Sequence, residues 1–199
     1  TFFEEEVAMS AQRNSDSVPA ASSSSWQSAR LLVTDEFAAP PVILRVGDSV
    51  IGTLGNFSAS TGKAKSKKTF NVCAIVAAAM TGGTVLNYSA SLPPRKRRIL
   101  YVDTEQSRFH CKRVLCRILR LAGLPTDAHP PLLEFLCLRG YATKERLRKI
   151  EEAIYDLDNL GLVVIDGIRD LAHDINSPGE ATDLITKLMQ WTDERRIHI

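Results

Sequence analysis

Long apolar runs, paired cysteine motifs and internal repeats are all missing from this 199-residue sequence. No stretch approaches the roughly 18 apolar residues that a membrane-spanning helix needs, and the start of the chain lacks the apolar centre of a signal peptide. We therefore expect an intracellular, cytoplasmic protein that has no contact with a membrane. The four cysteines form no CxxC pair, which argues against a zinc site and against a disulfide framework. Reduced thiols are expected instead.

The composition is that of an ordinary globular domain, with 44% hydrophobic and 24% charged residues. These values exclude a wholly disordered chain and a fibrous repeat. A chain of this length is expected to form one domain with its own core. The sequence starts at Thr1 and stops at Ile199 soon after an apparent helix. We therefore expect a part of a longer protein, incomplete at its C-terminus.

The formal net charge of +2 hides a strong segregation of charge along the chain. Thirteen Lys and Arg residues and only two acidic ones, Asp103 and Glu105, lie between Gly62 and Arg120, a local net charge of +11. The other twelve basic and twenty-one acidic residues leave the rest of the chain at −9. Such a basic segment is typical of a surface for polyanions, either nucleotide phosphates or nucleic acid.

Two regions of the chain differ in character. Residues 1–41 are expected to form an acidic and Ser-rich extension, because the Ser, Ala and Pro of residues 11–29 bury too little apolar surface to fold. Residues 42–199 are expected to form the folded core. This core opens with two short strands, Val42–Arg45 and Ser49–Leu54, around a Gly-Asp turn.

From residue 55 onward, short apolar strands alternate with helices. The predicted strands are Phe57–Thr61, Ile99–Val102, Glu134–Leu138, Leu162–Ile165 and Arg196–Ile199. The predicted helices are Thr69–Met80, Ser107–Ala122, one that Thr143 caps, and one that a Ser177–Glu180 capping box opens. This alternation predicts an α/β fold, in which helices cover both faces of a parallel sheet.

The strongest chemical signal is the run from Gly62 to Thr69, between a predicted strand and a predicted helix. Gly62, Lys68 and Thr69 match the phosphate-binding pattern G-x-x-x-x-G-K-[ST], whereas Lys67 stands where the second glycine belongs. In such a loop, backbone N–H groups wrap the β-phosphate, Lys68 reaches the β and γ oxygens, and Thr69 ligates magnesium. The predicted nucleotide-binding residues are Gly62, Lys63, Ala64, Lys65, Ser66, Lys67, Lys68, Thr69 and Phe70.

Two alternatives to this assignment remain open. A register on Gly62-Lys63 puts Ala64 where a hydroxyl is needed and Phe57 where the first glycine is needed, so we prefer Lys68. The other alternative is a Lys-rich solvated loop that precedes a helix by chance. The missing glycine is also expected to strain the backbone or to change the path of the loop.

Acidic residues follow two of the predicted strands. One strand ends in Asp103-Thr104-Glu105, and the strand Leu162–Ile165 ends in Asp166. Carboxylates at the carboxyl ends of parallel strands point into the ligand crevice. Glu105 is therefore predicted to be the general base that activates water, with Asp103 as the next candidate, and Asp166 to hold magnesium. Capping of the following helix is the alternative role for Asp103 and Glu105.

In this order and spacing, the three segments resemble the RecA-like superfamily of P-loop ATPases. Asp103-Thr104-Glu105 is similar to the catalytic-glutamate segment of the recombinases. Gly55–Thr69 and the Asp166 strand are similar to RepA-type helicases and ATPases of bacterial plasmids and mobilisable transposons. The likeness covers about residues 42–199. It implies ATP and Mg²⁺, work on DNA, and a homo-oligomeric ring or filament such as a hexameric ring.

The remaining basic residues fall into two groups. The run Arg95–Arg98 is most simply explained by solvation at the start of a strand. The helix after Glu105 has five basic and no acidic residues between Arg108 and Arg120, so it repels itself unless a polyanion or an acidic subunit lies against it. From this helix, we predict that three residues contact the phosphates of DNA, mainly single-stranded DNA. They are Arg113, Arg117 and Arg120.

Three functions compete on this pattern. The leading prediction is an ATP-hydrolysing, helicase-like motor or recombinase-like ATPase that acts on DNA in replication, mobilisation or recombination of a mobile element. The alternative is a slow nucleotide-dependent switch or loader that assembles on a protein partner. A small-molecule kinase is the third, although the sequence shows no acceptor site or lid for it. Stimulation of ATP turnover by single-stranded DNA would separate the first from the other two.

Overall fold

The computed structural model describes residues 26–62, 67–172 and 178–199, and the chain divides into two units, Thr1–Ala38 and Ala39–Ile199. Among its described residues, the first unit contains the short 3₁₀ helix η1 (Trp26–Ala29). The second unit contains the sheets, the core and the predicted site. Within the described ranges, no helix combines the length and the apolar character needed to cross a membrane.

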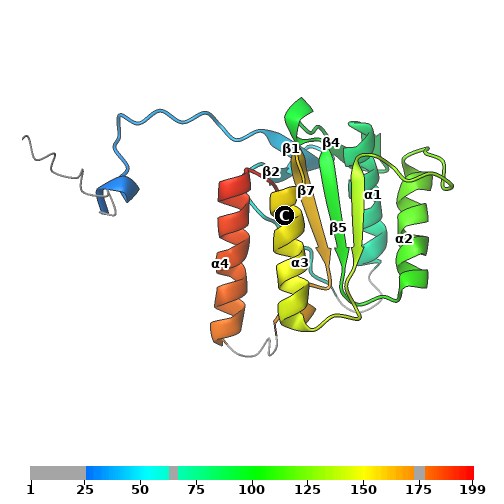
Figure 1. The fold of residues 1–199 in the computed structure, drawn as a ribbon. Helices are drawn as coiled ribbons and strands as arrows, with labels where there is room; N and C mark the ends of the chain where they lie inside the picture. The colour runs from blue at the N-terminus through cyan, green and yellow to red at the C-terminus, as the bar shows by residue number, and fades with distance from the viewer. Residues whose placement is uncertain (1–25, 63–66, 173–177) are drawn as a thin grey trace, which may run out of the picture. The chain divides into compact units, whose positions relative to one another are not determined.

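A parallel sheet forms the centre of the second unit (Figure 1). Its strand order is β6-β5-β7, with β5 (Arg98–Asp103) between β6 (Leu133–Cys137) and β7 (Leu160–Asp166). Asp103 at the end of β5 is in register with Asp166 at the end of β7. The two acidic strand ends identified in the sequence therefore lie side by side at one edge of the sheet.

Helices cover both faces of this sheet, as Figure 1 shows. One face is covered by α1 (Lys68–Thr81) and α2 (Arg108–Leu121), and the other by α3 (Thr143–Asp156) and α4 (Pro178–Arg195). The predicted α/β fold is confirmed.

The middle strand β5 explains why its sequence is apolar without alternation. Ile99 and Tyr101 belong to the core cluster shared with α1 and α2, whereas Leu100 and Val102 belong to the cluster shared with α3 and α4. All four side chains are fully buried, and so is Trp191 of α4. Burial on both faces removes any position at which a polar side chain could reach water.

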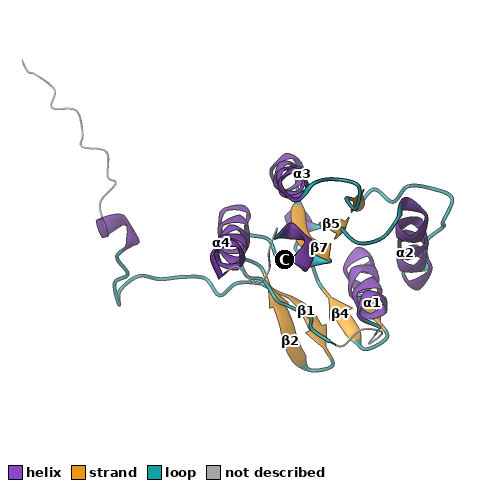
Figure 2. Cartoon of the chain, turned by 90° about the horizontal axis from the view of Figure 1, so that it is seen from below, coloured by secondary structure: helices purple, strands orange, loops and turns teal. Residues whose placement is uncertain are grey.

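The second unit also contains an antiparallel sheet (Figure 2), of which the sequence predicted one of the two hairpins. Its order is β2-β1-β4-β3, from β1 (Val42–Val46), β2 (Ser49–Thr53), β3 (Thr84–Val85) and β4 (Tyr88–Ala90). The β1–β2 hairpin was predicted. The β3–β4 hairpin was missed, because its strands are very short and its turn places Leu86, not glycine, at a φ of +55°.

Two predicted strands, Phe57–Thr61 and Arg196–Ile199, are not strands in the structure. His198 instead forms isolated parallel bridges with Asn56 and with Leu162 of β7. The C-terminal residues therefore lie between β7 and the segment that leads toward the predicted phosphate loop. Longer pairing is not supported, because the residues after Phe57 are small and mostly polar and bury little apolar surface.

The helix ends follow the sequence with one correction. α1 ends at Gly82, which has a φ of +66° and donates its N–H to the carbonyl of Ala78 at 2.9 Å. Thr143 does not cap α3, because Ala142 already has the extended backbone of the N-cap and its carbonyl accepts the N–H of Arg146. The predicted Ser177 cap lies outside the described residues.

Candidate functional site

β5 ends in a tight turn that Asp103 holds in place. Asp103 is fully buried, and its Oδ1 accepts hydrogen bonds from the backbone N–H groups of Glu105 (3.0 Å) and Gln106 (2.7 Å). Its Oδ2 accepts a third bond from Nε2 of Gln106 (2.8 Å). The N-cap of α2 is Ser107, which makes no side-chain capping bond. Asp103 therefore anchors the turn that presents Glu105, and it does not cap the helix.

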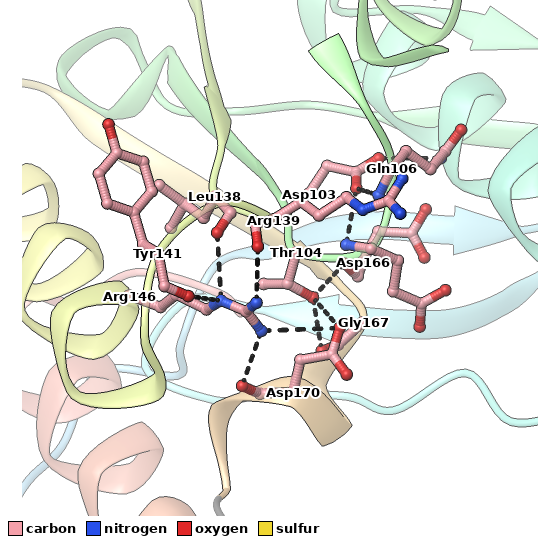
Figure 3. Close-up of polar contacts among 11 residues, drawn as sticks. Asp103, Thr104, Gln106, Leu138, Arg139, Tyr141, Arg146, Asp166, Gly167 and Asp170 are labelled. Carbon is pink, nitrogen blue, oxygen red and sulfur yellow. Dashed lines mark hydrogen bonds and ion pairs between the residues drawn. The ribbon is translucent and has the colours of Figure 1, made fainter.

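Thr104 joins this turn to the end of β7 (Figure 3). Its N–H donates to the carbonyl of Asp166 at 3.1 Å. Its Oγ1 lies 3.2 Å from that same carbonyl, 2.8 Å from the carbonyl of Gly167 and 3.0 Å from Oδ2 of Asp170. Gly167 has a φ of +99°, and a β-carbon there would lie 2.2 Å from Oγ1 of Thr104 and 2.8 Å from Cγ of Glu105. The site therefore requires glycine at this position.

Arg146 of α3 holds the neighbouring turns together (Figure 3). Its Nε donates to the carbonyls of Leu138 (3.1 Å) and Tyr141 (2.7 Å), after the end of β6. Its terminal nitrogens donate to the carbonyls of Arg139 (2.9 Å) and Asp170 (3.1 Å). The sequence did not identify Arg146, because in the sequence it is one of several basic residues in the first turns of a predicted helix.

The carboxylate of Asp166 meets the start of α1. Oγ1 of Thr69 donates to Oδ2 of Asp166 at 3.0 Å, and the hydroxyl of Tyr101 donates to the same oxygen at 3.1 Å. Tyr101 is fully buried and stacks on Phe135 with ring centroids 4.6 Å apart. Burial, above all, raises the pKa of Tyr101 above its ordinary value, so it remains a donor. A hydroxyl within an otherwise aliphatic strand was the signal that could have identified Tyr101.

Glu105 lies among charged groups from three segments of the chain. Partial burial is the largest of the causes that raise the pKa of its carboxyl above the ordinary value. The neighbouring carboxylates of Asp170, Asp166 and Asp103, in decreasing order of effect, raise this pKa further. The ammonium group of Lys68 lowers it. A carboxylate with a raised pKa is a better proton acceptor. Glu105, Lys68 and Asp166 therefore share one site.

The predicted phosphate loop is described only at its two ends. Lys63, Ala64, Lys65 and Ser66 lie outside the described residues. Gly62 is exposed, and its carbonyl accepts a hydrogen bond from Nζ of Lys68 at 3.1 Å. Phe70, one residue after Thr69, is 38% exposed.

Lys67 directly precedes α1 and has a backbone conformation that usually belongs to glycine. Its φ is +60° and its ψ is +25°, which is the left-handed region. A β-carbon in this region costs about 1 to 2 kcal/mol. The backbone strain expected from the missing glycine is therefore present in the structure.

A comparison with known protein families matches residues 27–199 to a family described as an AAA domain. The chain belongs to this family. AAA-type domains are P-loop ATPases, so the prediction of a nucleotide-hydrolysing P-loop ATPase is confirmed at that level. A search of curated proteins found no match, and neither did a search of solved structures.

The oxygen donors of this AAA domain suit magnesium. The hydroxyl of Thr69 and the carboxylate of Asp166, 3.0 Å apart, are hard ligands of the kind that Mg²⁺ prefers. Among the described residues, no group of three or more His, Cys, Asp or Glu side chains is placed to hold a metal. This donor set is that of an ion held jointly by one or two protein groups and the substrate phosphates.

The basic face of α2 is divided between surface and interior. Arg113 and Arg120 are exposed, whereas Arg117 is half-buried. The guanidinium of Arg117 lies against Cys73 of α1, where it lowers the pKa of the thiol, although burial dominates and raises that pKa to about 11. Two of the three predicted DNA-binding arginines therefore face solvent, and the third also takes part in packing between α1 and α2.

Proposed function

We propose that this AAA-type ATPase couples ATP hydrolysis to work on DNA, as a helicase-like motor or recombinase-like ATPase of a mobile element. The order of Lys68-Thr69, Glu105 and Asp166 along the chain supports a RecA-like, RepA-type assignment. The basic segment between Gly62 and Arg120 supports DNA as the partner, because a nucleotide accounts for only part of its charge. A homo-oligomer, such as a hexameric ring, is the assembly that this assignment implies.

One observation carries the proposed ATP site. Thr69 and Asp166 are 97 residues apart in the sequence, and Thr69 Oγ1 donates to Oδ2 of Asp166 at 3.0 Å. We assign these two residues to Mg²⁺, which when bound would neutralise charge on the β- and γ-phosphates. Lys68 is one residue from Thr69 at the start of α1, and we assign it to the phosphate oxygens.

Glu105 is the proposed general base. It lies in the turn that Asp103 anchors, so its backbone is held by a hydrogen bond to the buried carboxylate of Asp103, while Glu105 itself remains accessible. The carboxylate would accept a proton from the water that attacks the γ-phosphate. The raised pKa of Glu105 favours this role over that of a permanently ionised ligand.

The ATP site is tested with two lysine variants. Lys68→Ala should abolish ATP hydrolysis, because the transferred phosphoryl group loses its main cation. Lys63→Ala removes the same charge nearby and should have a mild effect. The rate of phosphate release from ATP, measured for both variants, shows which lysine binds the phosphates. Activity that survives Lys68→Ala but not Lys63→Ala would mean that the phosphate-binding register is wrong.

DNA binding is tested on the two exposed arginines of α2. Replacing Arg113 and Arg120 by Gln should weaken binding of single-stranded DNA and flatten its salt dependence, by roughly 0.7 to 0.9 log units of slope for each DNA phosphate that the protein no longer neutralises. Arg117→Gln is measured separately, because its side chain also packs against Cys73. The matched control replaces Lys144 and Arg148 by Gln, because both are exposed on α3, which covers the other face of the parallel sheet. Equal losses in the control would remove the case for a DNA-binding face on α2.

A slow nucleotide switch or loader remains the second candidate, and Lys67 is the observation that favours it. The left-handed lysine stands where a P-loop pattern has glycine, which is compatible with slow turnover. ATP turnover measured with and without single-stranded DNA discriminates the two. Stimulation supports the motor. Unchanged turnover, together with loss of self-association when Arg113 and Arg120 are replaced, supports the switch.

A further inference from the structure

Two cysteine thiols meet next to the turn that carries Glu105. Cys111 lies in the first turns of α2 and Cys137 is the last residue of β6. Both are free thiols, and their sulfur atoms are 3.3 Å apart. A disulfide bond is about 2.05 Å long, so a covalent bond requires the sulfurs to approach by only about 1.3 Å.

Both sulfurs point at the same backbone carbonyl. Sγ of Cys111 lies 3.5 Å from the carbonyl oxygen of Gln106, and Sγ of Cys137 lies 3.6 Å from it. Gln106 directly follows Glu105, and Asp103 binds the N–H groups of both residues. A bond between the two sulfurs would remove both thiol hydrogens and change the contacts of this turn.

One of the two thiols can be reached from outside. Cys137 is half-buried and lines an open pocket, together with Arg108, Arg139 and Tyr141 among others. Cys111 is 4% exposed. Two arginines at the pocket favour a reagent that carries carboxylates.

We propose that Cys111 and Cys137 form a redox-active pair, which a small carboxylate-bearing disulfide oxidises to an intramolecular disulfide and which small thiols reduce again. The thiolate of Cys137 attacks one sulfur of the reagent and releases the other half as a thiolate. Cys111 then loses its proton and attacks Sγ of Cys137, and the second half of the reagent leaves as a thiol. The two protein thiols are oxidised by two electrons, and the reagent disulfide is reduced to two thiols.

The two cysteines differ in the part they take. Burial is the main cause that raises the pKa of the Cys111 thiol, and its contacts with Cys137 and Asp103 raise it further. A buried thiol with a raised pKa is a poor first nucleophile. Cys137 is therefore the attacking residue, and Cys111 resolves the mixed disulfide.

The test uses the reduced 199-residue chain and glutathione disulfide as the probe. After equilibration, remaining thiols are alkylated and the protein is digested with trypsin. The basic residues place each of the four cysteines on its own peptide, so Phe109–Lys112 separates Cys111 from Cys116 on 114–117. We expect two protected thiols and a cross-linked peptide that joins Phe109–Lys112 to Leu121–Arg139. Four alkylated thiols, or a cross-link through Cys73 or Cys116, would overturn the proposal.

Variants test the order of attack. Cys111→Ser should stop at a glutathione adduct on Cys137, whereas Cys137→Ser should give neither the adduct nor the cross-link. Cys116→Ser, on the same helix, is the matched control and should cross-link like the unmodified chain. Thermal melting of each reduced variant confirms that it is folded, and Cys111→Ala replaces Cys111→Ser if the latter is not. An adduct on Cys111 in the Cys137→Ser chain would contradict the assigned order.

The effect of the cross-link on hydrolysis rests on the proposed role of Glu105. We expect the oxidised chain to hydrolyse ATP roughly tenfold more slowly, because displacing a catalytic group by about 1 Å can cost up to 10²-fold. Dithiothreitol should restore the rate. If the reduced chain hydrolyses no ATP, the proposed function fails. The peptide map still shows whether Cys111 and Cys137 form a disulfide. If the cross-link forms and the rate is unchanged, the coupling to Glu105 is wrong.

Discussion

The acidic half and the lysine half of the site are built in opposite ways. At the ends of β5 and β7, Asp103, Thr104 and Arg146 join backbone turns through partly buried hydrogen bonds. At the start of α1, by contrast, Lys67 and Lys68 are exposed, and one of them has a left-handed backbone. The acidic half is therefore held by the folded protein itself. Substitution of the anchoring residue Asp103 should cost stability as well as activity, whereas removal of the exposed Lys68 side chain should change activity alone.

The largest expected effect distinguishes the proposed base, Glu105, from the residue that anchors its turn, Asp103. Glu105→Gln should lower ATP hydrolysis by roughly 10²- to 10⁴-fold, because the amide cannot accept a proton from water. ATP binding and the melting temperature should be unchanged, since the side chain is exposed. Asp103→Ala is the comparison: it removes the acceptor of two backbone N–H groups and should lower the free energy of unfolding by about 2 kcal/mol or more. An active Glu105→Gln chain would move the role of base to another residue.

Gly167→Ala should be a damaging small change within the acidic half. The added carbon would meet Oγ1 of Thr104 at 2.2 Å and Cγ of Glu105 at 2.8 Å, at a φ of +99°. We expect a loss of about 2 to 4 kcal/mol in the free energy of unfolding, from overpacking together with backbone strain. Gly123→Ala is the matched control, because Gly123 has a φ of +69° and no atom within 4 Å of the added carbon. Equal losses in urea unfolding would show that backbone strain alone explains both.

The pH dependence of hydrolysis tests the electrostatics of the acidic half. Glu105 must be ionised to accept a proton, so hydrolysis should rise as the pH rises through its raised pKa. Asp170→Asn removes the neighbouring charge that raises this pKa most, after burial. The acidic limb of the rate profile should therefore move to lower pH. Asp183→Asn, an exposed position on α4, should leave the limb in place. An identical shift in both variants would contradict the assignment.

The smallest expected effect concerns the lysine half. Lys67→Gly should raise the free energy of unfolding by about 0.5 to 1 kcal/mol, because relief of left-handed strain exceeds the added entropy of the unfolded chain. Lys67→Ala keeps the β-carbon and should give no such gain. Chemical unfolding of both variants measures the difference. A gain in both would trace the effect to the lysine charge.

The sequence predicted the elements whose signal is local. The continuous apolar strands around Ile99 and Val163, the glycine stop at Gly82 and the acids that end two strands each depend on neighbours in the chain. It failed where pairing partners are distant. The local pattern predicted a full strand over Arg196–Ile199, but it could not show that only His198 would form bridges there, with Asn56 and Leu162. The β3–β4 hairpin was missed for the related reason that strands of two and three residues depend on β1 for their stability.

Alternation of strand and helix, the lysine-rich run before α1, and the carboxylates at Asp103, Glu105 and Asp166 were determined by the sequence alone, because residue type and spacing suffice to state them. Tertiary structure decided what those residues do to one another. It made Asp103 an anchor and left Glu105 exposed, although both end the same strand. It also placed Arg146 against the turns after β6 and β7, and the two neighbouring thiols against the turn that carries Glu105. Such roles depend on burial and on distances between segments far apart in the chain, and these exist only once the sheet has formed.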